Sequence, residues 1–135
     1  MFKRLIALCL AAFAFSSASA QTWIPMPFDK DVSVDVDSIK HVGLSNTFSF
    51  WAKWSGRHVS KQDKKNGVLY GVQRLIVKCK PYVTTMQENT IFYTKDRIFR
   101  TSLTRTYDYN EYPPDSVGQS ISEMICEYQE QGAQP

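Results

Sequence analysis

The sequence is poor in the residues that most catalytic and metal sites require. It holds three cysteines and two histidines, His41 and His58, among 135 residues. It contains no glycine-rich phosphate loop and no Gly-x-Ser-x-Gly segment, and its glutamates form no spaced pair typical of general acid–base catalysis. Because nucleophile and zinc sites depend on thiols or imidazoles at defined spacings, we predict a protein that is not an enzyme and holds no metal or cofactor.

The sequence also lacks an apolar run long enough to span a bilayer. Its longest run, Leu5 to Phe15, follows Lys3 and Arg4 and precedes the small residues Ala18-Ser19-Ala20. That order is typical of a cleaved secretory signal. We therefore expect residues 1–20 to be a signal peptide and residues 21–135 to form one domain, of the size at which a single core is normal.

Little net charge remains once the predicted signal is removed. The chain carries a net charge of +3, and Lys3 and Arg4 account for two of those charges. A nearly neutral domain is a poor candidate for nucleic-acid binding, which favours a clearly basic body. Cys9 lies inside the apolar run after the bulky Leu8, a context unsuited to lipoprotein processing. We expect an unlipidated protein in the periplasm of a Gram-negative envelope, or at the cell surface or secreted.

Two cysteines, Cys79 and Cys126, remain in the mature chain. Exported proteins meet an oxidising compartment, so we expect these two to form a disulfide. The alternatives are two free buried thiols or a metal pair, and the second is disfavoured because only His41 and His58 could complete it.

Alternating patterns predict a sheet. In residues 31–37, Val32, Val34 and Val36 share one face, and the aspartates share a face that we expect to be solvated. The aspartates from Asp29 onward superficially suggest a calcium loop, but the segment lacks the glycine and glutamate of an EF-hand. We therefore expect Asp29 to be solvated as well. The remaining expected elements are strands at 22–26, 47–54, 68–80, 89–95 and 97–104, and a polar loop at 55–67 ending in an Asn-Gly turn.

A helix is predicted after Pro113-Pro114, where Ser116 and Gln119 match a capping box. Its apolar stripe is expected at Val117, Ile121, Met124, Ile125 and Tyr128. Cys126 lies about 180° from Val117 on an ideal helical wheel, so we expect either an unwound end or a disulfide that wraps around the flank. The predicted class is α+β: a five- to six-stranded antiparallel sheet with a C-terminal helix packed on one face and tethered by a disulfide.

Four segments, in this order and spacing, resemble the surface-adhesin protein E family. They are Val32–Ile39, Phe48–Lys53, Gln73–Tyr82 and Pro114–Tyr128. The resemblance implies an antiparallel sheet with a disulfide-tethered C-terminal helix, and adhesion to host extracellular-matrix or plasma proteins. This chain lacks the usable lipoprotein cysteine of the surface-held adhesin. A periplasmic structural or accessory envelope protein with no adhesin role is therefore the alternative.

A basic loop and an outward sheet face form the candidate binding surface for a protein partner, either a host matrix protein or an envelope protein. Its residues are Trp51, Arg57, Lys61, Lys64, Lys65, Arg74, Lys78 and Lys80. The alternative is a solvated loop with lysines that protect sheet edges. Trp51 is the candidate aromatic anchor, unless the 22–28 segment or a second copy in a homodimer covers it. A deep apolar pocket would instead favour a small-ligand carrier or inhibitor.

Overall fold

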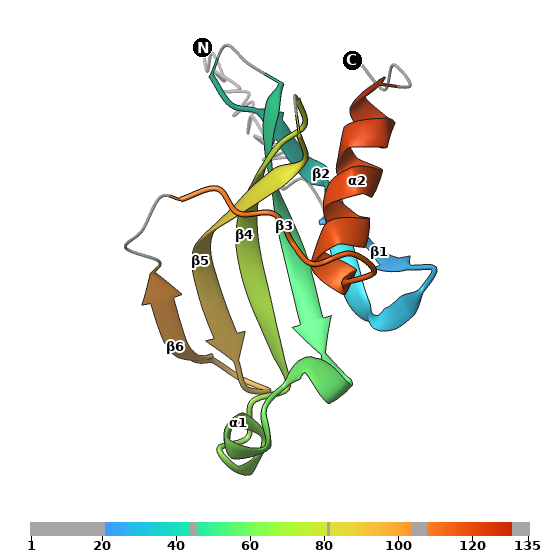
Figure 1. The fold of residues 1–135 in the computed structure, drawn as a ribbon. Coiled ribbons are helices and arrows are strands. Elements are labelled where there is room, and N and C mark those ends of the chain that lie inside the picture. Colours follow the sequence, from blue (N-terminus) through green and yellow to red (C-terminus); the bar gives the residue numbers. More distant parts are fainter. Residues whose placement is uncertain (1–20, 44–45, 81, 104–107, 131–135) are drawn as a thin grey trace, which may run out of the picture.

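In the described part of the chain, six antiparallel strands follow one another in sequence order across one sheet, and one long helix packs on it (Figure 1). The computed structural model describes residues 21–43, 46–80, 82–103 and 108–130, so the predicted signal peptide lies outside them. The strands are β1 (Trp23–Met26), β2 (Asp29–His41), β3 (Thr47–Ser55), β4 (Tyr70–Lys78), β5 (Thr84–Tyr93) and β6 (Ile98–Leu103). The helices are η1 (Gly56–His58), α1 (Lys61–Lys65) and α2 (Val117–Glu130). The predicted α+β class is confirmed.

One face of the sheet, called the core face, packs against α2. Phe50 on β3 is fully buried and lies opposite Leu75 on β4, while Ala52 lies opposite Val34 on β2. Ile121 and Ile125 of α2 belong to the same buried cluster. Full burial of each large apolar side chain contributes roughly 1.5–3 kcal/mol, so this layer holds the helix on the sheet. The opposite face, called the outer face, carries Trp51.

The buried stripe of α2 is rotated from the predicted one. The buried residues are Gly118, Ile121, Ser122, Ile125 and Cys126, and Tyr128 is exposed. Their spacing matches one face of a continuous helix, so both expectations about Cys126 are wrong: the helix does not unwind, and the cysteine lies on the buried stripe. Two small residues at the helix–sheet contact explain the difference, because Gly118 and Ser122 carry no apolar signal. Ser122 Oγ is 2.7 Å from the hydroxyl of Thr85.

Strand β2 departs from simple alternation. Asp35 and Lys40 are five residues apart on β2, but their partners on β3 are only two residues apart. The extra residues form a bulge in β2, and Val36 is only half-buried. At the bulge, the hydroxyl of Ser38 takes the place of a backbone acceptor and accepts a hydrogen bond from the backbone N–H of Trp51 at 2.9 Å. The expectation of a solvated aspartate face is wrong for Asp29 and Asp35, both of which are buried. Asp35 accepts backbone N–H groups of Thr22 and Asp37, which offsets the cost of its burial.

The segment predicted as a plain polar loop at 55–67 contains η1 and α1. Ser60 caps α1 by accepting the backbone N–H of Asp63 at 3.1 Å. The Ser-x-x-Asp spacing is a helix-start signal and was the clue to this short helix. The Asn-Gly turn is confirmed, because Gly67 has a φ of +82°, a conformation that favours glycine.

The predicted disulfide is confirmed. Cys79 follows β4, Cys126 lies near the end of α2, and their Cα atoms are 5.6 Å apart. The two residues are 47 positions apart in sequence. The bond therefore joins the middle of the chain to its last helix and limits how far the unfolded chain can expand.

Reduction of this disulfide should lower the free energy of unfolding by about 4 kcal/mol, the value that a loop of this length gives on the chain-entropy model. Urea denaturation with and without a phosphine reductant measures the difference. The Cys79→Ser/Cys126→Ser double variant should show the lower stability in both conditions. Equal stability of the oxidised and reduced wild type would contradict a stabilising role for the bond.

Candidate functional site

The buried carboxylate of Asp29 contacts two basic side chains, those of Arg57 and His58. Its side chain is 3% exposed, and its Oδ2 lies 2.5 Å from Arg57 Nη2 and 2.6 Å from His58 Nε2. Hydrogen bonds from Arg57, and then from His58, lower the pKa of Asp29 to about 2. The ring of His58 meets Trp54 edge to face, with centroids 5.3 Å apart. The cluster ties the first residue of β2 to η1.

The His58–Asp29 pair resembles the orienting half of a catalytic triad, but no nucleophile completes it among the described residues. Ser60, the hydroxyl residue nearest to His58 in sequence, donates instead to Asp63 Oδ2 at 2.9 Å. Gly56 must be glycine, because its φ is +54° and a Cβ there would lie 2.5 Å from Asp31 Oδ2. The contacts of Asp29 with Arg57 and His58 hold the η1 turn against the start of β2.

The eight predicted binding residues do not lie together. Lys61, Lys64 and Lys65 are exposed on α1, at the lower end of the sheet in Figure 1. Trp51 and Arg74 are half-buried cross-strand neighbours on the outer face. The list is completed by Arg57 at Asp29, Lys78 at the far end of β4, and Lys80 beside the disulfide.

Much of the predicted positive charge is neutralised within the protein. Arg57 pairs with Asp29, Arg74 lies 3.1 Å from Glu88, and Lys80 lies 3.5 Å from Glu130. The eight residue steps from Tyr70 to Lys78 separate the ends of β4 by about 26 Å. The structure therefore does not bring the eight residues into one continuous basic patch.

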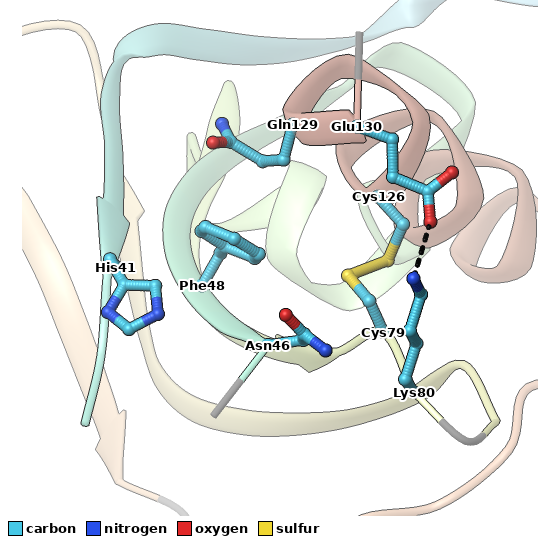
Figure 2. Close-up of a pocket in the computed structure, with 8 residues that line it drawn as sticks. All are labelled: His41, Asn46, Phe48, Cys79, Lys80, Cys126, Gln129 and Glu130. Atoms are coloured by element: carbon cyan, nitrogen blue, oxygen red, sulfur yellow. Dashed lines mark ion pairs between the residues drawn. A yellow bond between two sulfur atoms is a disulfide. The ribbon is translucent and has the colours of Figure 1, made fainter. Parts of the chain in front are cut away.

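A cavity of about 530 Å³ lies beside the disulfide, where β2 ends, β3 begins and α2 ends (Figure 2). Phe48 forms its apolar side and meets His41 edge to face at 5.3 Å. Lys80 and Glu130 close the side next to the sulfur atoms with an ion pair. The described residues contain no group of three or more side chains suited to hold a metal ion, here or elsewhere.

Strand β6 is the most exposed strand of the sheet. All six residues from Ile98 to Leu103 are exposed, with Ile98 at 54% and Leu103 at 70%. Within the described part of the chain, β6 pairs only with β5, so its other edge presents free backbone N–H and C=O groups. Sequence analysis predicted the strand and missed its edge position, because strand order is not visible in a pattern of alternation.

A second cavity, of about 570 Å³, opens on the core face beside the start of α2. Its apolar and aromatic lining includes Trp54, Val59, Phe92, Tyr112 and Val117. Gly71 lies within β4 on its floor, and a glycine inside a strand pattern is a signal for such a space. Among the described residues, no helix is long and apolar enough to cross a membrane.

Comparisons of the chain with protein-family models, with curated proteins and with solved structures found no match.

Replacement of Asp29 by Asn should destabilise the protein most at neutral pH. A carboxyl with a lowered pKa stabilises the fold above its unfolded pKa, near 3.8, and loses that effect as the pH falls toward about 2. The gap in urea midpoint between wild type and Asp29→Asn should therefore be constant from pH 7 to about 5, and close between about pH 4 and 2. Asp96→Asn, which neutralises an exposed carboxylate in a turn, is the control. A gap independent of pH would contradict an ionic role for Asp29.

Proposed function

We propose that this chain is an exported, non-enzymatic binding domain of the surface-adhesin protein E kind, which captures a protein partner along β6. The exposed edge of β6 is the observation that carries the proposal. The disulfide supports export, because oxidising compartments outside the cytosol are where structural disulfides persist.

An open strand edge selects for polypeptide. Its alternating N–H and C=O groups match the backbone of an extended segment, which can add to the sheet as a further strand. Neither a glycan nor a nucleic acid offers that repeat. Ile98, Phe99 and Leu103 add apolar contact area along the same edge, where natural edge strands more commonly carry charges that prevent pairing.

The lysines of α1 support the same proposal in a secondary role. Lys61, Lys64 and Lys65 are exposed at one end of the sheet, and among the described residues they take part in no ion pair. Charges of this kind speed the approach of an acidic partner more than they strengthen the final complex. The resemblance to surface adhesins suggests a host matrix or plasma protein as this partner. The alternative is an envelope protein bound by a periplasmic accessory domain.

Leu103→Lys should weaken partner binding at least ten-fold, because it places a charge on the pairing edge. The measurement is biolayer interferometry at physiological salt against a panel of purified extracellular-matrix and plasma proteins. Leu69→Lys is the matched control: it makes the same change at a residue that is 54% exposed and lies outside β6. Both positions are exposed, so neither change should shift stability by more than about 0.5 kcal/mol.

Amide hydrogen exchange on the complex adds a direct measure, since a strand added to the edge should protect amides of β6. Equal binding by the two variants, or a complex without protection in β6, would overturn the pairing surface. If no protein of the panel binds and fractionation finds the protein only in the periplasm, the adhesin role is wrong and the accessory role replaces it.

A further inference from the structure

The outer face of the sheet carries a cluster of aromatic side chains from three strands. Trp23 comes from β1, Tyr70 from β4 and Tyr93 from β5, and all three are half-buried. They line a pocket of about 270 Å³, called the outer pocket, together with Gln21, Lys53 and Val72. This volume is just below the range of sites for drug-sized ligands, so the outer pocket has room for one ring-sized group.

Strand pairing fixes the positions of the two tyrosines. Tyr70 and Tyr93 are directly opposite each other on β4 and β5. Their rings stack with centroids 5.0 Å apart and planes inclined by 18°. Side chains that are already ordered in this way lose little further freedom when a ligand binds. The stacked pair is therefore a preformed aromatic wall.

Lys53 places one positive charge among these rings. Its Nζ lies 4.9 Å from the ring centroid of Trp23 and 5.7 Å from that of Tyr70. The ammonium makes no ion pair with a described residue, and no carboxylate lines the outer pocket. Arg74, in contrast, lies on the same face and pairs with Glu88 at 3.1 Å. A cation–π contact at a partly exposed site is weaker than a charge-assisted hydrogen bond, so Lys53 can still accept an anionic partner.

Polar groups accompany the aromatic surface. The hydroxyls of Tyr70 and Tyr93 and the amide of Gln21 belong to lining residues and make no hydrogen bond to a described residue. A sugar has a matching division, with C–H groups on the faces of its ring and hydroxyls around its edge. The C–H groups are attracted to the negative faces of aromatic rings, and the hydroxyls exchange hydrogen bonds with phenol and amide groups.

We propose that the outer pocket binds an acidic sugar, a hexuronic acid unit of a polysaccharide, whose ring packs against the aromatic side chains and whose carboxylate accepts a hydrogen bond from Lys53 Nζ. In a hexuronic acid the carboxylate is attached directly to the ring. Ring and charge are therefore adjacent in the ligand, as the aromatic wall and Lys53 are in the protein. An acidic peptide carries its charge on a flexible side chain without such a ring. The site lies on the outer face and does not depend on partner binding at the β6 edge.

A pair of matched probes tests the proposal on the full chain. Trigalacturonate and its methyl ester have the same sugar rings and differ in the charge of the carboxyl groups. The acid should bind about five-fold more tightly at low salt, the ratio expected for one partly exposed ion pair, and the preference should shrink at high salt. Titration followed by two-dimensional ¹H–¹⁵N NMR should move the indole N–H signal of Trp23. The signal of Trp54, whose indole N–H is buried, should stay in place.

Variants separate the charge from the aromatic wall. Lys53→Gln should keep the affinity for the ester and remove the preference for the acid. Lys61→Gln makes the same change on an exposed lysine of α1 and should keep that preference. Tyr93→Leu should weaken binding of both probes about five-fold, because an aliphatic side chain replaces one ring of the stack.

Four results would overturn the proposal: no binding of trigalacturonate by the folded protein at millimolar concentration, equal affinity for acid and ester in the wild type, an acid preference that persists in Lys53→Gln, or binding of triglutamate as tight as that of trigalacturonate. The last result would show a site that recognises charge alone and would favour an acidic peptide. If Tyr93→Leu fails to fold, the comparison of Lys53→Gln with Lys61→Gln still decides.

Discussion

The attachment of α2 to one side of the sheet is the constraint on which the other features depend. A helix of 14 residues is about 21 Å long and about 10 Å wide, whereas five spacings between six strands span about 24 Å. One helix can therefore cover little more than two strands. The Cys79–Cys126 bond and the Ile121–Ile125 contacts place it toward β2, β3 and β4. The uncovered remainder of the sheet contains both the core-face cavity and the exposed strand β6.

Two buried aspartates tie the short helices η1 and α1 to the lower end of the sheet in Figure 1. Asp29 joins η1 to the start of β2 through Arg57 and His58. Asp63 of α1 receives both terminal nitrogens of Arg100 from β6, at 2.6 and 3.0 Å, and that guanidinium lies 4.1 Å from the ring of Phe92. Each carboxylate is desolvated but paired, which makes removal of either partner costly. Arg57 and Arg100 are therefore engaged within the fold, whereas Lys61, Lys64 and Lys65 of α1 remain exposed.

The sequence allowed prediction of the strands, the terminal helix and the disulfide, because each has a local signal or follows from the compartment. Alternation located β2 and β3, and two cysteines in an exported chain indicated a pair. The bulge after Asp35 and the rotation of α2 were not predictable by the same reasoning. The bulge depends on how Ser38 meets a neighbouring strand, and the rotation on the small residues Gly118 and Ser122. These are tertiary contacts, which the hydrophobic periodicity of a single segment does not reveal.

The candidate sites show the same limit more strongly. Charge counts directed attention to lysines and arginines, yet a count cannot show that Arg57, Arg74 and Lys80 lie beside carboxylates. The informative feature is instead the edge of β6, which the packing leaves without a partner strand in the described part of the chain. An open edge of this kind can accept a further extended segment of polypeptide as an added strand.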